Sequence, residues 1–306
     1  MVSDVLWDFN RCYLSFGCHG GLWVKKINSL IAGVFLWCAL LSAVSAAESL
    51  TLAVHPYKSS SALIKAFSPL ADYLSLKLNL DVDLQISSSY HSHVDRLGNN
   101  QVDVAYLGPA SYVLLVDKFG SKPILARQLI NGQPFFQGKI IARRDSPVNS
   151  LQALLGKRFA FGDPSSTMSH LVPRYMLIKA GLGTEKLSEH QFLGSHDNVA
   201  LGVLTGDFDA GAVKEAVFYK YQSRGLKALA TTPSIPEHLF VARSDLATET
   251  ILELRRSLVG MDETEEGRRA LASIKKTITA LEPADDADYD VLRDVFSVLS
   301  RAGVQL

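Results

Sequence analysis

A succession of strand, helix, strand, helix and strand patterns occurs twice in this sequence, and it constrains the fold more than any other feature. In the first occurrence, alternating residues at 50–54 are followed by apolar residues three and four apart at 63–78. Alternating residues return at 82–86, and a second helical segment leads to a third strand at 102–107. Strands separated by helices pair in parallel through right-handed crossovers, which predicts an α/β lobe.

The second occurrence has strand patterns at 158–161, 191–193 and 209–213, with helical patterns between them. Both series end in the same way, because a helix is followed by Gly or Asn and then by an Asp that leads a short apolar strand (Asp103 and Asp209). The chain is therefore predicted to contain two α/β lobes of similar build.

Two extended segments, 138–143 and 238–243, flank the second series and are predicted to cross between the lobes. A chain that leaves the first lobe and later returns to it makes the second lobe an insertion. The tail after residue 248 has apolar stripes at helical spacing and is predicted to be helical. The expected boundaries are 48–140 plus 240–306 for lobe 1 and 141–239 for lobe 2.

The N-terminal part of the chain has the layout of a secretory signal peptide, predicted to span 1–47. A pair of lysines precedes an apolar run at 30–41, and small residues fill 42–47. About twelve apolar residues reach only roughly 18 Å along a helix, less than the ~30 Å of a bilayer core, which favours a cleaved signal over an uncleaved anchor. The part before the lysines is long and acidic for such a leader, so we expect the true start near Leu22 or Val24. A periplasmic location follows.

The charge balance and the cysteines exclude several classes of function. The chain has 31 Lys and Arg against 31 Asp and Glu, so no basic excess favours broad binding to nucleic acid. With 47% hydrophobic residues, the composition is that of a globular protein. Cys12, Cys18 and Cys38 all lie within the predicted signal peptide, which excludes thiolate catalysis and a cysteine-bound metal in the rest of the chain.

A cluster of hydroxyl groups lies at a predicted helix start within 162–170. Unpaired backbone amides and the positive end of the helix dipole favour an anion at such a position. Ser166, Thr167 and the amides that follow them can bind a tetrahedral oxyanion without any Arg or Lys. In the alternative interpretation, the Ser and Asp residues of this segment only cap the helix.

Three further candidates lie where predicted strands end. His196 follows a strand at the crevice position where open α/β sheets bind ligands, although a surface or capping role is the alternative. Tyr57 and Tyr106 end strands of the first lobe, and they either face the second lobe across a cleft or cover the core.

Patterns for metal binding and for catalysis have weaker support. His91 and His93 lack a nearby third ligand and are interpreted as part of an exposed loop. Ser166, His196 and Asp209 are the residue types of a hydrolase triad, but no nucleophile elbow surrounds the serine. We therefore expect no enzyme activity, no metal and no cofactor.

These residues, taken in order, resemble a known family. The sequence is similar to the periplasmic phosphate/phosphite/phosphonate-binding proteins of ABC transporters, the PhnD-like group, and the likeness covers nearly all of the chain after the leader. The stretches that carry it are Pro56-Tyr57, 67–74, 103–112, the turn at 163–167 with Pro173, and Ser195-His196.

The resemblance implies a type II periplasmic binding protein, in which two α/β lobes joined by a two-strand hinge close on a ligand. In such relatives a Ser-Thr turn, a His and two Tyr residues hold the oxyanion. The family turn commonly continues with Ser or Ala and then Gly, whereas this chain has Met168 and Ser169, a change that removes a hydroxyl and narrows the pocket. The matching residues are Tyr57, Tyr106, Ser166, Thr167, the amide of Met168, and His196.

Relatives that bind aminoalkylphosphonates place carboxylates near the ligand ammonium. Asp209, Glu215 and Glu237 are the candidates for this role here, and Asp209 is included among the predicted ligand-binding residues. The resemblance thus implies a non-enzymatic receptor that captures a phosphonate, phosphite or phosphate for an ABC permease in the inner membrane. A periplasmic sensor that reports its ligand to a membrane histidine kinase is the alternative.

Overall fold

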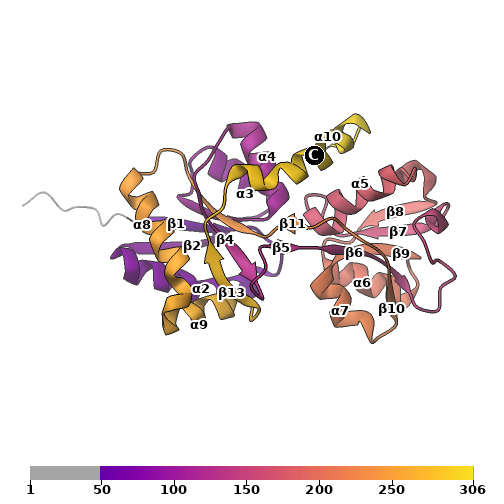
Figure 1. Ribbon diagram of the computed structural model, residues 1–306, viewed down its shortest axis with the longest axis horizontal. Coiled ribbons are helices and arrows are strands. Elements are labelled where there is room, and N and C mark those ends of the chain that lie inside the picture. Colours follow the sequence, from indigo (N-terminus) through magenta and orange to yellow (C-terminus); the bar gives the residue numbers. More distant parts are fainter. Residues whose placement is uncertain (1–48, 306) are drawn as a thin grey trace, which may run out of the picture. The chain divides into compact units, whose positions relative to one another are not determined.

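The computed structural model describes residues 49–305, so the predicted signal peptide and the three cysteines lie outside the described residues. Within the described range, no helix is long and apolar enough to cross a bilayer. This part of the chain forms two α/β lobes, each built around its own sheet (Figure 1).

The first lobe contains a six-stranded mixed sheet in the order β13-β4-β12-β3-β1-β2. Strands β2, β1 and β3 pair in parallel, as the alternation of strands and helices predicts. Strands β12, β4 and β13 continue the sheet by antiparallel pairing. The strands are β1 (Ser49–Val54), β2 (Asp81–Ile86), β3 (Val104–Leu107), β4 (Ile124–Ile130), β12 (Leu239–Ala242) and β13 (Ile278–Glu282).

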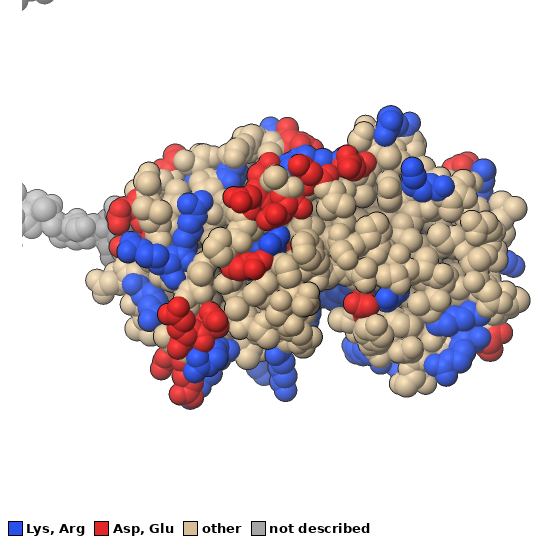
Figure 2. Space-filling model, in the orientation of Figure 1, with Lys and Arg blue, Asp and Glu red and all other residues tan. Residues whose placement is uncertain are grey.

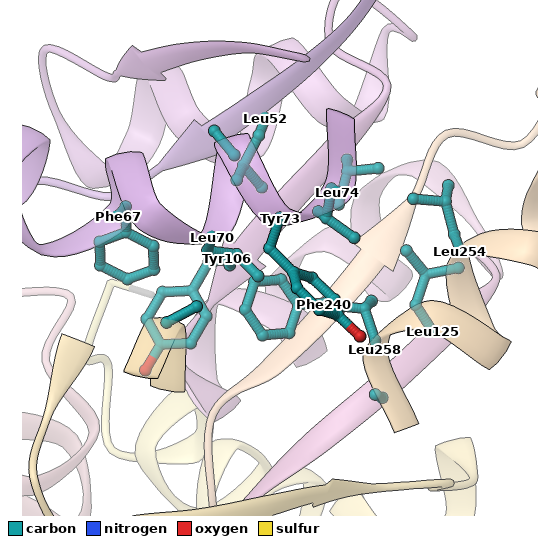
Figure 3. Packing of buried hydrophobic residues seen from close by; sticks show 14 of the residues in the cluster. Leu52, Phe67, Leu70, Tyr73, Leu74, Tyr106, Leu125, Phe240, Leu254 and Leu258 are labelled. Carbon is teal, nitrogen blue, oxygen red and sulfur yellow. The ribbon is translucent and has the colours of Figure 1, made fainter. Parts of the chain in front are cut away.

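Helix α2 is an example of how the helices of this lobe form and pack on the sheet. Its apolar residues recur three and four apart, so Phe67 and Leu74 are buried on one face, and it ends at Asn79, whose backbone is left-handed (φ 52°). That face packs on Leu52 and Tyr106 of the sheet (Figure 3). The helices of the lobe are α2 (Ser60–Leu78), α3 (Tyr90–Gly98), α4 (Pro109–Phe119), α8 (Thr248–Val259), α9 (Glu265–Ile274), α10 (Asp290–Arg301) and the 3₁₀ turns Gly260–Glu263 and Asp286–Tyr289.

The second lobe contains a five-stranded sheet in the order β10-β6-β9-β7-β8. Strands β9, β7 and β8 are parallel, whereas β6 pairs antiparallel with both β9 and β10. Its strands are β6 (Gly138–Arg143), β7 (Arg158–Phe161), β8 (Glu189–Phe192), β9 (Ala210–Lys214) and β10 (Leu226–Thr231). Its helices are α5 (Val172–Lys179), α6 (His196–Thr205), α7 (Glu215–Gln222), the 3₁₀ turns Gln152–Leu154 and Thr184–Lys186, and a π-helical turn at Thr167–Leu171.

The crossings between the lobes lie a few residues earlier than predicted. Segment 138–143 forms β6 inside the second sheet, and most of 238–243 forms β12 inside the first. The connecting pieces are β5 (Phe135–Phe136) and β11 (Ile235–Pro236), which pair antiparallel as a separate two-stranded sheet between the two large ones (Figure 1). The predicted pair of extended crossings is therefore real, but it is shorter.

The C-terminal tail is not entirely helical, which corrects the sequence prediction. Residues Ile278–Glu282 form β13, an edge strand that pairs only with β4. The two buried residues of this strand, Ile278 and Leu281, are three apart because the register shifts between Ile278 and Ala280. A bulge of this kind gives a strand the apolar spacing of a helix, so the period of the sequence misleads here.

Helices of the first lobe also contact the π-helical turn of the second lobe and the residue that follows it. Met168, Leu171 and Val172 share one apolar cluster with Tyr112 of α4 and Leu292 of α10. Helix α10 lies close to α4 and to α5 (Figure 1). The turn predicted to bind an anion is therefore fixed by packing on both lobes.

Candidate functional site

A cavity of about 370 Å³ lies between the two lobes and is lined by residues from both. Tyr57 and Tyr106 contribute from the first lobe, and the turn at 163–169 and His196 contribute from the second. These positions are loops and strand ends at the carboxyl edges of parallel strands, where open α/β sheets bind ligands. Of the predicted binding residues, the structure brings together Tyr57, Tyr106, Ser166, Thr167, Met168 and His196.

The hydroxyl of Ser166 both caps a helix and faces the cavity. Ser166 is the N-cap of the π-helical turn, and its Oγ accepts a hydrogen bond from the amide of Ser169 at 3.3 Å. Because this lone pair is used, the hydroxyl proton remains for an acceptor in the cavity. The capping and anion-binding interpretations of the turn are thus compatible.

Thr167 is held in a similar way by the other lobe. Its Oγ1 accepts a hydrogen bond from the amide of Ala110 at 3.2 Å, in the first turn of α4. The amide orients the hydroxyl so that its proton is free to be donated. Met168 lines the cavity too, and its Sδ accepts a hydrogen bond from Thr232 Oγ1 at 3.5 Å.

His196 is a neutral donor. Its Nδ1 accepts a hydrogen bond from the backbone amide of Lys214 at 3.0 Å, so the ring proton is on Nε2. Burial, assisted by the nearby Lys214 ammonium, lowers the pKa of His196 to about 3. The imidazole therefore stays uncharged at physiological pH and offers one N–H group.

An aromatic wall closes the side of the cavity formed by the first lobe. The ring of Tyr106 stacks on His55 and His238, with centroids 5.6 and 5.4 Å apart. Burial raises the pKa of Tyr57 and of Tyr106, so both phenols stay protonated. The Tyr106 hydroxyl donates to Gln128 Oε1 at 3.0 Å, which ties it to the protein rather than leaving its proton free. Sequence reasoning missed both histidines, although His55 directly follows a buried strand.

Three lysines at the cavity were also missed. Lys58, Lys214 and Lys275 line it, so the site is not built from hydroxyls and amides alone. Burial, the positive charge of Lys275 and that of Lys58 lower the pKa of Lys214 to about 8, although Glu237 acts in the opposite direction. The signal in the sequence is a lysine that ends a buried strand, since Lys214 is the last residue of β9.

Glu237 is the buried carboxylate of the cavity. Burial opposes its ionisation, but hydrogen bonds from His238 at 2.9 Å and Gln128 at 2.8 Å lower its pKa to about 2. Glu237 is therefore ionised, and side chains of the protein already supply part of its hydrogen bonds. Glu215, the other candidate that lines the cavity, pairs with Lys139 at 3.0 Å.

Asp209 does not line the cavity, which corrects its assignment as a ligand-binding residue. Its Oδ2 accepts a hydrogen bond from the backbone amide of Arg158 at 2.9 Å, at the start of the neighbouring strand β7. Asp103 does the same in the first lobe, where it accepts from the amide of Thr51 at 2.7 Å. The similar endings of the two series are thus a structural repeat, in which an Asp joins two parallel strands.

The residues considered for a hydrolase triad and for a metal site are not arranged for those roles. A triad would need a carboxylate at His196 Nδ1, where the amide of Lys214 lies instead. His91 and His93 lie on helix α3 rather than on a loop, and His93 is buried with its ring bonded to Ser87 and to the backbone of Tyr106. Within residues 49–305, no group of three His, Cys, Asp or Glu is placed to hold a metal ion.

Comparisons with known proteins all point to one family of substrate-binding proteins. A family model described as the periplasmic substrate-binding protein of a phosphonate ABC transporter matches residues 52–289. The chain is 30% identical over 277 residues to the phosphate-import protein PhnD of Mycolicibacterium smegmatis, with 82% of this chain and 86% of the relative covered. It is 26% identical over 240 residues to the phosphonates-binding periplasmic protein of Escherichia coli, with 74% and 71% covered.

A solved structure has the same fold. PhnD1 of Prochlorococcus marinus, in complex with methylphosphonate, superposes with a TM-score of 0.74 at 22% sequence identity, covering 82% of this chain and 98% of that chain. The comparison supports the predicted architecture of two α/β lobes joined by a two-strand hinge.

Proposed function

Because the chain belongs to the family of periplasmic substrate-binding proteins of phosphonate ABC transporters, we propose that its cavity captures a small phosphorus oxyanion and delivers it to a membrane permease. Proteins of this family bind and transport their substrate and are not enzymes. The alternative of a sensor for a histidine kinase finds no support among the relatives. A periplasmic location agrees with the relatives, and we infer that the segment 1–47 directs export.

One observation carries the proposal. Three uncharged groups at the cavity, on Ser166, Thr167 and His196, are each fixed as donors because a backbone amide already occupies an acceptor position of the same side chain. Donors held at one cavity suit the charged oxygens of an oxyanion, which can only accept. The donors need no reorganisation when the ligand arrives, and this lowers the cost of binding.

The test removes two of these donors. We expect the double variant Ser166→Ala, Thr167→Ala to bind methylphosphonate or phosphate more weakly by roughly 2–5 kcal/mol, because hydrogen bonds to a charged group are lost. Calorimetric titration of the mature protein with phosphate, phosphite and methylphosphonate measures the affinity.

The matched control is Thr264→Ala. Thr264 also caps a helix by accepting an amide hydrogen bond, at 3.1 Å from Gly267, but neither it nor the first turn of its helix lines the cavity. It should cost stability without changing affinity. If the double variant binds as tightly as the unmodified protein, the turn does not hold the ligand; if the folded, unmodified protein binds none of the three anions, the proposed ligand class is wrong.

A further inference from the structure

The cavity has room for more than an oxyanion. Its volume of about 370 Å³ is within the range of sites for small organic molecules, roughly 300–1,000 Å³. An inorganic oxyanion has only five heavy atoms, and a water molecule takes about 30 Å³ of liquid volume. Space therefore remains beside the donors of the Ser166–Thr167 turn for an organic part of the ligand.

The lysines at the cavity exceed what the oxyanion donors require. Lys214 ends β9 in the second lobe, next to His196, whereas Lys58 and Lys275 belong to the first lobe. All three lysines line the same cavity, and the charges of Lys275 and Lys58 add to burial in lowering the pKa of Lys214, so both repel the Lys214 ammonium. Such repulsion is relieved by a negative ligand group among them.

Two of the carboxylates that line the cavity are paired with lysines outside this group. Glu215 pairs with Lys139 at 3.0 Å, and Asp197 pairs with Lys220 at 2.5 Å. In the described part of the chain, no carboxylate lies within ion-pair distance of the Nζ of Lys58, Lys214 or Lys275. Apart from Glu237 and Asp163, the charged groups of the lining that have no lysine partner are therefore the three lysines.

Glu237 and Asp163 are the two remaining acidic groups of the lining, and their negative charges oppose those of the lysines. Glu237 lies in the field of Lys214 and Lys275, and its Oε2 already accepts from His238 and Gln128. Asp163 lines the cavity beside the hydroxyl turn and accepts from the amide of Ser165 at 2.8 Å. Counted against the three lysines that line the cavity, Glu237 and Asp163 leave one positive charge uncompensated.

We propose that the ligand carries a second anionic group, as a carboxyalkylphosphonate or a phosphorylated carboxylic acid does, and that Lys214 with Lys58 and Lys275 binds this group. The inference rests on the proposed function, since the phosphorus oxyanion is assigned to the turn and His196. It also predicts discrimination against aminoalkylphosphonates, because their ammonium would meet three like charges.

Calorimetry with three phosphonates that differ in their second group tests the inference. We expect phosphonoacetate to bind at least about tenfold more tightly than methylphosphonate, because a charge-assisted hydrogen bond is worth about 1.5–3 kcal/mol, and 2-aminoethylphosphonate to bind more weakly than both. The variant Lys214→Met should reduce the ratio between phosphonoacetate and methylphosphonate about tenfold. Lys65→Met, on an exposed position of α2 away from the cavity, is the control and should leave the ratio unchanged.

The outcomes separate this inference from the proposed function. Equal affinity for phosphonoacetate and methylphosphonate, or tighter binding of 2-aminoethylphosphonate, overturns the second anionic group and leaves the oxyanion site intact. Failure of every phosphonate and of phosphate to bind the folded protein overturns both. The double variant Lys58→Met, Lys275→Met gives a second measurement of the ratio, and a ratio that neither substitution changes also overturns the inference.

Discussion

The side chains at the cavity differ in whether they titrate near neutral pH. His196, with its pKa lowered to about 3 by burial, is neutral, and Glu237, with its pKa lowered to about 2 despite burial, is charged. Lys214 is the group whose pKa, about 8, lies close to physiological pH. Anion binding should therefore depend on pH through Lys214 and not through His196.

The sign of this dependence follows from linkage. Burial and the neighbouring lysines lower the pKa of Lys214 in the free protein, and a bound anion raises it again, so binding takes up a proton near pH 8. We expect affinity to fall as the pH rises above about 8, by at most about tenfold per pH unit. Calorimetry between about pH 7 and 9 measures it, and Lys214→Met is the reference because the ligand's own titration is common to both proteins. An identical pH profile in the variant would show that Lys214 does not bind the ligand.

The position of some residues at the cavity was predictable from the sequence and that of others was not. Ser166, Thr167 and His196 were expected there because strand ends and helix starts meet at one edge of parallel sheets, and they line the cavity. Asp209 was misassigned. In the sequence, an acidic residue before a strand looks the same whether its side chain faces a ligand or accepts a hydrogen bond from the neighbouring strand, as it does here. The cavity lysines were missed because a single lysine after a strand gives no sign of the lysines that the fold places opposite it.

At the level of elements, the π-helical turn depends on a glycine in the strand-to-turn connection before it. A Cβ on Gly162 would lie 2.1 Å from Ser169 Oγ and 2.7 Å from Ser169 Cβ, closer than atoms can approach. The backbone amide of Gly162 also donates to the carbonyl of Ser169 at 3.0 Å. The turn with the oxyanion donors is therefore packed directly on this residue.

We expect Gly162→Ala to displace the turn, to weaken ligand binding and to destabilise the protein by about 1–3 kcal/mol, as overpacking does. Adding Ser169→Gly removes both clashing atoms and should restore most of the affinity. Thermal unfolding and calorimetry on the two single variants and the double variant check this. The explanation fails if Gly162→Ala binds normally, or if the second change restores nothing.

The sequence predicts the parallel strands and their helices well, because these follow clear periodicities. Strands β1, β2, β3, β7, β8 and β9 all lie within a few residues of their predicted segments. Strand β13 was predicted as part of a helical tail because its bulge changes the apolar spacing. The crossing strands β5 and β11 have only two residues each, too few for any periodicity to reveal.

For the molecule as a whole, the balanced charge of the chain is compatible with a cavity that binds an anion through a few local groups. Figure 2 shows Lys and Arg interspersed with Asp and Glu on the face that it presents, while the lysines of the cavity come from both lobes. Near neutrality of the chain therefore does not argue against an anionic ligand. A local field at the cavity attracts the ligand without a large net charge.

Export is the prediction that belongs to the whole chain. If 1–47 is a cleaved signal peptide, the protein recovered from the periplasm should begin near Glu48, which N-terminal sequencing of the exported protein measures. The mature chain would then contain no cysteine, so its folding would not depend on disulfide formation. Recovery of an uncleaved form bound to the membrane would contradict the cleaved signal and favour an anchor.

The hydrogen bond from Ala110 to Thr167 has a consequence for how long a ligand stays bound. The Thr167 oxygen accepts from the first turn of α4 in one lobe, and its hydroxyl proton is available to an anion bound in the cavity. Successive hydrogen bonds of this kind polarise and strengthen one another, so a bound anion tightens the contact between the lobes. The ligand thus acts as a reversible cross-link, and its residence time is set in part by how often this contact breaks.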